Sequence, residues 1–421
     1  MKKFFISIII SSVLITSIIT IGIVRIKKEN DQIDRESVTL REDLTVEFGK
    51  EVKVSSFIDK LNGQMLNDFI IETDELGTKE ITFEFLNIKN KHKKATFNIE
   101  IIDKTAPKIY GGNSYTVTKG YKKDLTNLML SGDNIDDNPI RRIEGKYDLN
   151  TIGDYFLTYV ITDSSKNETK SNFILHVVEK QENKTANRDN INIEDVISMH
   201  KTSYTKIGID VSKWQGEINW EEVKEAGVEF AIIRVGYQKD YDNKDYTIDP
   251  FFISNIEGAK RVNIPVGIYF YSYARTIEEA VEQAKWVREQ IKDYNIELPI
   301  AFDWESWASF NTTNMSFYKI NKIANIFLDT LAEFGYKGML YGSKNYLETV
   351  WEPTKYDIWL AHYIDKTTYQ GKYSIWQIGD TGRVKGINGA VDIDILYEKW
   401  DEKDKSVLLK LSDYRYIINK K

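Results

Sequence analysis

The chain has 421 residues, enough for about three domains of ordinary size. It contains no cysteine, which excludes disulfides, zinc–thiolate sites, iron–sulfur clusters and thiol nucleophiles. With 57 Lys and Arg against 64 Asp and Glu, the net charge is −7, and this acid excess argues against nucleic acid as the main partner. The four histidines fall in separate segments, so neither a metal nor a cofactor is expected, and carboxylates and aromatic side chains remain for chemistry.

An uncharged apolar run near the N-terminus predicts a membrane anchor. Residues 4–24 follow Met1-Lys2-Lys3 and precede Arg25. As a helix, such a run spans about 30 Å, enough for a bilayer core. A cleaved signal peptide is the alternative, but its apolar core usually has only about 7–15 residues. We therefore expect residues 1–28 to form a cytoplasmic stub and an uncleaved signal anchor of a single-pass protein, with the rest on the wall side of the cell membrane; secretion after cleavage is the alternative.

The segment from residue 36 to residue 179 predicts two copies of one β module. Apolar and polar residues alternate over 80–85 and 95–101, as in strands with one buried face. The segment also resembles itself, since 45–49 matches 116–120 and 95–103 matches 171–179. We expect two all-β, immunoglobulin-like sandwiches, residues 36–103 and 104–179. Their junction, Asp103-Lys104-Thr105-Ala106-Pro107, resembles the one that opens many bacterial immunoglobulin-like wall modules.

These modules are expected to act as spacers, because no exposed aromatic cluster marks a carbohydrate- or protein-binding surface. The acidic run from Asp133 to Asp137 lacks the glycine and the terminal glutamate of an EF-hand loop, so a solvated loop is favoured over a calcium site. Residues 180–203 are rich in Glu, Asn, Lys and Asp and are expected to be a linker.

Strands and helices alternate from residue 204 to about residue 400. Helices concentrate in the first half, where Asp249 is expected to be a helix N-cap and Thr276 opens a capping box. Eight strands with helices mainly in the first half predict an irregular, TIM-like (β/α) barrel. The predicted strands are 207–211, 230–235, 265–271, 298–305, 338–341, 357–363, 374–378 and 391–396.

Four acidic residues lie at strand ends, where such barrels carry their catalytic groups. Asp210 ends the first predicted strand, Asp303 and Glu305 end the fourth, and Asp392 begins the last. Residues two apart in a strand share a face, so Asp303 and Glu305 should point the same way. Their repulsion should raise the pKa of one of them, as a general acid at neutral pH requires.

Aromatic residues gather near the same predicted strand ends. Aromatic faces can stack on sugar rings, and paired carboxylates without metal ligands are the tools of glycoside hydrolysis. Ordinary core packing is the alternative for these side chains. The candidate substrate-binding residues, which include one glutamine, are Tyr271, Tyr273, Trp304, Tyr341, Trp359, Tyr363, Trp376 and Gln377.

The segment from residue 204 to about 400 resembles glycoside hydrolase family 25. The family consists of lysozymes, which are N-acetylmuramidases, and the resemblance implies its (β/α)5(β)3 barrel. His362 departs from the family pattern at the rim. The resemblance rests on Gly208-Ile209-Asp210-Val211-Ser212, Trp214-Gln215-Gly216, the strand from Pro265 to Ala274, Asp303-Trp304-Glu305, Trp359-x-Ala361-x-Tyr363, Trp376-Gln377 and Val391-Asp392.

By this resemblance the protein is a peptidoglycan hydrolase that cleaves the β-1,4 bond between N-acetylmuramic acid and N-acetylglucosamine. Glu305 carries over as the general acid, and Asp303 as the neighbouring carboxylate that supports charge or orients the 2-acetamido group. Asp210 and Asp392 carry over as further acids that line the site. The nucleophile stays open between a carboxylate and the substrate's own acetamido group. A catalytically silent wall-binding protein is the alternative function.

The expected partners are the glycan strands of peptidoglycan and, through the N-terminal helix, the cell membrane. A tethered wall hydrolase would suit a secretion or conjugation apparatus, which needs local openings in the wall without lysis. The C-terminal tail, residues 401–421, carries no functional expectation.

Overall fold

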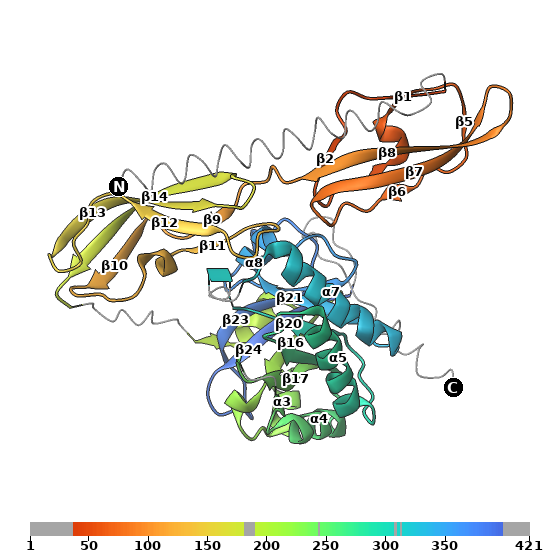
Figure 1. Cartoon of the computed structure of the whole chain (residues 1–421). Coiled ribbons are helices and arrows are strands. Elements are labelled where there is room, and N and C mark those ends of the chain that lie inside the picture. The colour runs from red at the N-terminus through yellow and green to blue at the C-terminus, as the bar shows by residue number, and fades with distance from the viewer. Residues whose placement is uncertain (1–36, 181–189, 243–244, 307–309, 312–313, 399–421) are drawn as a thin grey trace. The chain divides into compact units, whose positions relative to one another are not determined.

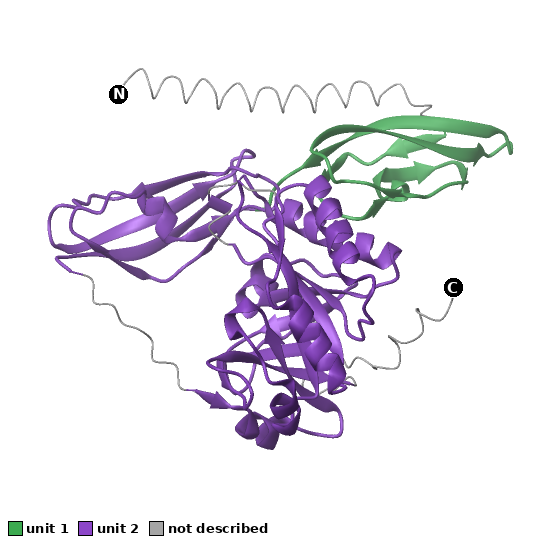
Figure 2. Ribbon diagram, turned by 90° about the horizontal axis from the view of Figure 1, so that it is seen from below, with its two compact units in different colours: residues 1–105 green, residues 106–421 purple. Residues whose placement is uncertain are grey.

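The computed structural model describes residues 37–180, 190–242, 245–306, 310–311 and 314–398. The predicted anchor at 4–24 and the tail at 401–421 lie outside the described residues. Within the described ranges, no helix is both long enough and apolar enough to cross a membrane. The chain divides into two compact units, residues 1–105 and 106–421 (Figure 2).

The described part of unit 1 is a β module built around one long hairpin. Its main sheet has the strand order β2-β8-β7-β5, and the pairs β1–β4 and β3–β6 complete it. Alternate hairpin residues such as Ile81, Phe83 and Phe85 are buried, as the sequence alternation predicts. The strands are β1 (Val38–Leu40), β2 (Thr45–Glu47), β3 (Val52–Lys53), β4 (Ile58–Leu61), β5 (Gly63–Met65), β6 (Ile70–Ile71), β7 (Gly77–Asn87) and β8 (His92–Ile102).

Unit 2 begins with a second β module of the same topology. Its main sheet has the order β10-β14-β13-β12, beside the pair β11–β9 (Figure 1). In both modules the first strand of the main sheet runs parallel to the second strand of the hairpin. The strands are β9 (Lys108–Tyr110), β10 (Ser114–Thr118), β11 (Leu130–Gly132), β12 (Ile140–Glu144), β13 (Gly153–Thr162) and β14 (Glu168–Val178).

The rest of unit 2 forms a closed eight-stranded barrel. Neighbouring strands from β16 to β23 pair in parallel, and β24 closes the barrel by pairing antiparallel with both β23 and β16 (Figure 1). The barrel-like fold that the sequence predicts is thus confirmed. The strands are β16 (Thr205–Val211), β17 (Phe230–Gln238), β19 (Val266–Tyr271), β20 (Ile300–Asp303), β21 (Gly338–Ser343), β22 (Asp357–Ala361), β23 (Ile375–Arg383) and β24 (Val391–Tyr397).

Helices follow each of the first five barrel strands and cover the outside of the sheet. One apolar core fills the space between strands and helices, and a second, smaller one fills the barrel interior. A short strand, β18 (Tyr246–Ile248), pairs with β17 before its helix begins. The helices are α3 (Trp220–Glu225), α4 (Phe252–Arg261), α5 (Ile277–Ile291), α7 (Phe317–Glu333) and α8 (Lys344–Thr349).

Part of the predicted linker, residues 180–203, belongs to the barrel domain instead. Strand β15 (Ile191–Asn192) pairs with β23, and helix α2 (Ile193–His200) follows it directly. Ile193 and Val196 of α2 are buried in the outer core of the barrel. The prediction failed because only two buried positions in one short helix set this segment apart from a polar linker.

The helix cap predicted at Asp249 is also wrong. Helix α4 starts at Phe252 with Phe251 as its N-cap. The Asp249 side chain instead accepts hydrogen bonds from Arg234 Nε at 2.8 Å and from the backbone N–H of Lys213 at 3.0 Å. Its Oδ1 also accepts from the backbone N–H of Phe251 at 3.0 Å, so Asp249 holds the helix entry from outside the helix and ties it to β17 and to the residues after β16.

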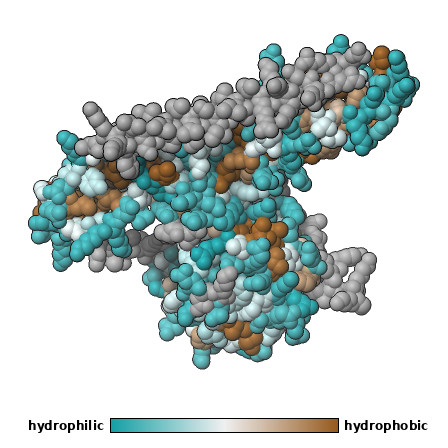
Figure 3. Space-filling model, in the orientation of Figure 1, coloured by the Kyte–Doolittle hydropathy of each residue, from teal (hydrophilic) through white to brown (hydrophobic). Residues whose placement is uncertain are grey.

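Large exposed apolar side chains are scattered over the chain. The face drawn in Figure 3 is mainly hydrophilic, and hydrophobic residues form separate spots on it. The most exposed of these side chains are Ile88, Phe156 and Trp214. They lie in the β7–β8 turn, in β13 and after β16, so they are three separate features.

Candidate active site

The strand register of the barrel brings two of the predicted acids face to face. Asp210, near the end of β16, is the cross-strand partner of Asp392, near the start of β24. Directly opposed residues in an antiparallel pair have Cβ atoms about 4.5–5.5 Å apart. Because β24 runs antiparallel, its first residues reach the same end of the barrel as the carboxyl ends of the other strands. Burial and the nearby Asp210 charge raise the pKa of Asp392 to about 9.

Asp303 and Glu305 form the second pair of acids. Asp303 is the last residue of β20 and is buried, whereas Glu305 lies two residues beyond the strand and is exposed to solvent. Burial, and then the Glu305 charge, raise the pKa of Asp303 well above its ordinary range. The surrounding protein also raises the pKa of Glu305, although its side chain reaches solvent, and a hydrogen bond with Asp303 partly offsets that rise. The pair therefore tends to hold a proton, and Glu305 is its accessible member.

A fifth carboxyl group, Asp394, belongs to the same cluster and escaped the sequence analysis. Its Oδ1 accepts a hydrogen bond of 2.8 Å from Trp359 Nε1, and the residue is completely buried. Burial raises the pKa of Asp394 to about 8, against the lowering effect of the Trp359 hydrogen bond. The signal that could have revealed it is strand alternation, because Asp394 stands two residues after Asp392 and shares its inward face.

Gln377 holds Asp210 in place at the barrel interior. Its Nε2 donates to Asp210 Oδ2 at 2.7 Å, while its Oε1 accepts from the hydroxyls of Tyr341 at 2.9 Å and Tyr363 at 3.0 Å. Burial and the Asp394 charge nevertheless raise the pKa of Asp210 well above its ordinary range. Gln377 and Tyr341, both predicted as substrate-binding residues, are buried and act here through Asp210.

Two tyrosines stand beside the Asp303–Glu305 pair. Tyr271 is the register partner of Asp303 on the neighbouring strand β19, and its ring lies 5.2 Å from that of Tyr273. Both rings are partly exposed, and Tyr363 is 43% exposed on the other side of the cluster. Of the predicted aromatic residues, these three present accessible surface near the acids.

The three predicted tryptophans are core residues, which corrects their assignment to sugar stacking. Trp304 and Trp376 are 0% and 3% exposed and belong to the core between the strands and helices. Trp359, 2% exposed, lies in the core of the barrel interior. Strand residues in a barrel alternate between interior and helix layer, and both are dry, so an aromatic at a strand end need not face the opening.

The raised pKa values predict a stability effect of Asp394→Asn. A carboxyl group whose pKa is raised in the folded state adds stability below its unfolded pKa, and this contribution is lost as pH rises through the folded value, here about 8. Asparagine keeps an acceptor for Trp359 without the ionisation. Denaturant unfolding measures the free energy of unfolding of both proteins at pH 5 and at pH 9. Between these pH values wild type should lose on the order of 2–4 kcal/mol more of this free energy than the variant does.

Asp365→Asn is the matched control, because Asp365 is an exposed aspartate of the same barrel domain. It should show the same pH dependence as wild type. The expectation would be contradicted if the free energy of unfolding changed with pH by the same amount in wild type and in Asp394→Asn.

A barrel with carboxyl groups clustered at the carboxyl ends of its strands is the arrangement that barrel hydrolases working with carboxylates use. Comparison with known proteins agrees: residues 209–387 match the model of glycosyl hydrolases family 25. The matched segment contains Asp210, Asp303 and Glu305 and ends before Asp392.

The chain is also similar to two named lysozymes and to a solved lysozyme structure. The chain is 28% identical over 190 residues to the autolytic lysozyme of Clostridium acetobutylicum, covering 44% of this chain and 54% of that protein. It is 29% identical over 210 residues to lysozyme M1 of Streptomyces globisporus, covering 44% and 65%. Among solved structures, a bacterial lysozyme from Streptomyces coelicolor has 25% identity and a TM-score of 0.39, with coverage of 51% and 99%.

The part of the C-terminal domain that the family model matches is therefore similar to the glycosyl hydrolases of family 25. The chain spans about half the length of the autolytic lysozyme that it matches.

Proposed function

We propose that the protein is an N-acetylmuramidase that cleaves the β-1,4 bond between N-acetylmuramic acid and N-acetylglucosamine in peptidoglycan. One observation carries the proposal: five carboxyl groups interact at one end of the barrel, and Glu305 is the most solvent-exposed of them. An exposed acid that shares a proton with a buried partner suits protonation of a leaving oxygen.

Glu305 is assigned as the general acid, and Asp303 as the buried partner that keeps a proton available to it. Asp210, fixed by Gln377, and Asp392 lie opposite each other on β16 and β24 and line the same opening. Tyr271 and Tyr273 offer partly exposed rings on which a sugar can stack. Glu305 protonates the glycosidic oxygen as the bond from this oxygen to the anomeric carbon breaks. Water then adds to the anomeric carbon and gives the new reducing sugar.

The test is a product analysis on purified peptidoglycan. The wild-type protein is incubated with the glycan, new reducing ends are converted with borohydride, and the reduced sugars are identified after acid hydrolysis. We expect reduced N-acetylmuramic acid. Reduced N-acetylglucosamine would refute the bond assignment but keep the hydrolase, and no new ends would favour the silent wall-binding alternative.

The cellular setting is also a proposal. We propose that residues 4–24 anchor the chain in the cell membrane, that unit 1 extends the protein into the wall, and that the barrel opens the wall locally. A secretion or conjugation apparatus that has to cross peptidoglycan is the partner that this architecture suits. Fractionation of cells expressing the protein tests the anchor: release into the medium, with loss of residues 1–28, would show cleavage instead.

A further inference from the structure

An arginine of the second β module contacts the barrel domain in the segment between β20 and α7. Arg141, on β12, donates from Nη2 to the backbone carbonyl oxygen of Phe310 at 2.8 Å. Its Nε donates to Ser131 Oγ at 2.9 Å, and Ser131 Oγ also bonds to the hydroxyl of Tyr159 at 2.8 Å, both residues being completely buried. Hydrogen bonds within the module thus hold the guanidinium in the position from which it contacts the barrel.

The same module also satisfies the start of helix α7. The first backbone N–H groups of an α-helix have no partner within the helix. Here the N–H groups of Phe317 and Tyr318 donate to the carbonyl oxygens of Asp133 and Asn134 at 2.9 and 2.8 Å. One residue further on, Lys319 Nζ lies 2.8 Å from Asp137 Oδ2.

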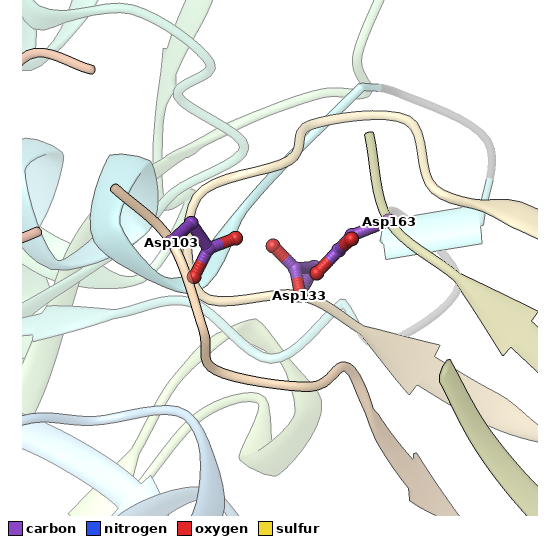
Figure 4. Close-up of side chains that lie close together, drawn as sticks. All are labelled: Asp103, Asp133 and Asp163. Carbon is purple, nitrogen blue, oxygen red and sulfur yellow. The ribbon is translucent and has the colours of Figure 1, made fainter. Parts of the chain in front are cut away.

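This contact corrects the expectation of a solvated acidic loop at residues 133–137. Asp133 is completely buried, and its Oδ2 accepts from the N–H groups of Ile135 and Asp136 at 2.9 and 2.7 Å. Another buried aspartate of the module, Asp163, lies close to it (Figure 4). The loop is therefore shaped by its own side chains and presents its carbonyl oxygens to α7.

A chain of aromatic rings links this contact to the catalytic pair. Trp304 stands between Asp303 and Glu305 in the sequence, and its ring lies 5.5 Å from that of Phe310. Phe310 lies 5.2 Å from Phe317. Gly132 of the module packs against Phe317 so closely that a Cβ there would lie 2.8 Å from the ring. The packing leaves little room for any member to move independently.

We infer that the second β module is a positioning element of the active site, and that Arg141 is its central positioning residue. The module holds Phe310 and the start of α7, these hold Trp304, and Trp304 sets the place of Glu305. The inference rests on the proposed function, because it concerns the position of the proposed general acid. It differs from the spacer role expected for this module, which requires no contact with the barrel.

The test compares Arg141→Gln with Arg142→Gln in the full chain, purified in mild detergent. Arg142 is the next residue on β12, but its guanidinium pairs with Glu144 and Glu168 within the module at 2.8 and 2.9 Å. On purified peptidoglycan we expect Arg141→Gln to lower kcat by about 10-fold, with KM within about twofold of wild type, because small displacements of a catalytic group are costly. Arg142→Gln should leave both values within about twofold.

A pH profile separates positioning from a general loss of structure. Looser packing around Trp304 replaces part of the protein that surrounds Glu305 with water and lowers the pKa of Glu305, so the alkaline limb of the kcat profile should move to lower pH in Arg141→Gln. An unfolded fraction would lower kcat at every pH without moving the limb. If Arg141→Gln does not fold, as judged by circular dichroism, Lys319→Gln takes its place, because Lys319 is partly exposed and contacts Asp137 of the module.

The possible failures are distinguishable. If wild type is active and Arg141→Gln has the same kcat and the same alkaline limb as wild type, the inference is overturned and the proposed function stands. Equal losses in Arg141→Gln and Arg142→Gln overturn it too, since only one of them reaches the barrel. A wild type that releases no reducing ends overturns the proposed function, and this inference with it.

Discussion

Glu305→Gln is expected to lower kcat on peptidoglycan by about 10²–10⁴-fold, the range that loss of a general acid usually produces. Glutamine keeps the size and hydrogen bonding of the side chain but cannot donate a proton to the leaving oxygen. Binding should change little, so the loss should appear in kcat rather than in KM. The rate of reducing-end release from purified peptidoglycan measures it.

Glu348→Gln provides the control for this substitution. Glu348 is an exposed glutamate on α8 that pairs with Lys344 at 2.7 Å, and its replacement makes the same chemical change away from the acid cluster. It should keep full activity. If Glu305→Gln retained more than about a tenth of the wild-type rate, another group would have to supply the proton, and Asp303 would be the first candidate.

Asp249→Ala is expected to destabilise the barrel domain by about 3–5 kcal/mol, because it leaves the Arg234 guanidinium buried without its counter-charge. Arg234 Nη2 lies 2.7 Å from Asp249 Oδ2, and the two side chains are 9% and 0% exposed. Asp249 also accepts from the backbone N–H of Lys213, close after Asp210 on β16. Denaturant unfolding at neutral pH measures the effect.

Glu221→Ala tests whether this loss comes from burial. Glu221 also pairs with an arginine, Arg261, at 2.8 Å, but both side chains are more than half exposed. Removing such a pair typically costs no more than about 1 kcal/mol. Similar losses in the two variants would mean that the Arg234–Asp249 pair owes its stability to something other than its burial.

The acid cluster could be predicted from the sequence because barrel geometry places strand ends together. Asp210, Asp303 and Glu305 each stand at the end of a strongly apolar strand, where the fold class puts catalytic groups. Asp394 was missed because it lies inside the last strand, whereas catalytic groups were expected at strand ends. The buried tryptophans were assigned wrongly because alternation along a strand separates its two faces but does not show that both faces are buried, one in the barrel interior and one under the helices.

The contact of the second module with the barrel could not be predicted from any local pattern. Arg141 and Phe310 are 169 positions apart in the chain. The carbonyl oxygens that accept hydrogen bonds from the α7 N–H groups belong to the backbone of Asp133 and Asn134. Every residue carries such a group, so the residue type does not indicate which of them makes the contact. A contact of this kind appears only when the two folded domains are seen together.

The reversed direction of β24 has a consequence for changing substrate preference. Asp392 pairs with Asp210 at the catalytic end, whereas Tyr397 pairs with Thr205 at the opposite end. The segment that enters β24, residues 384–390, therefore belongs to the rim around the substrate, although it follows the last parallel strand. Residues 388–390 are exposed, so this stretch is a natural place to insert or exchange sequence in a library aimed at other glycans. Changes at the far end of β24 would leave the rim as it is.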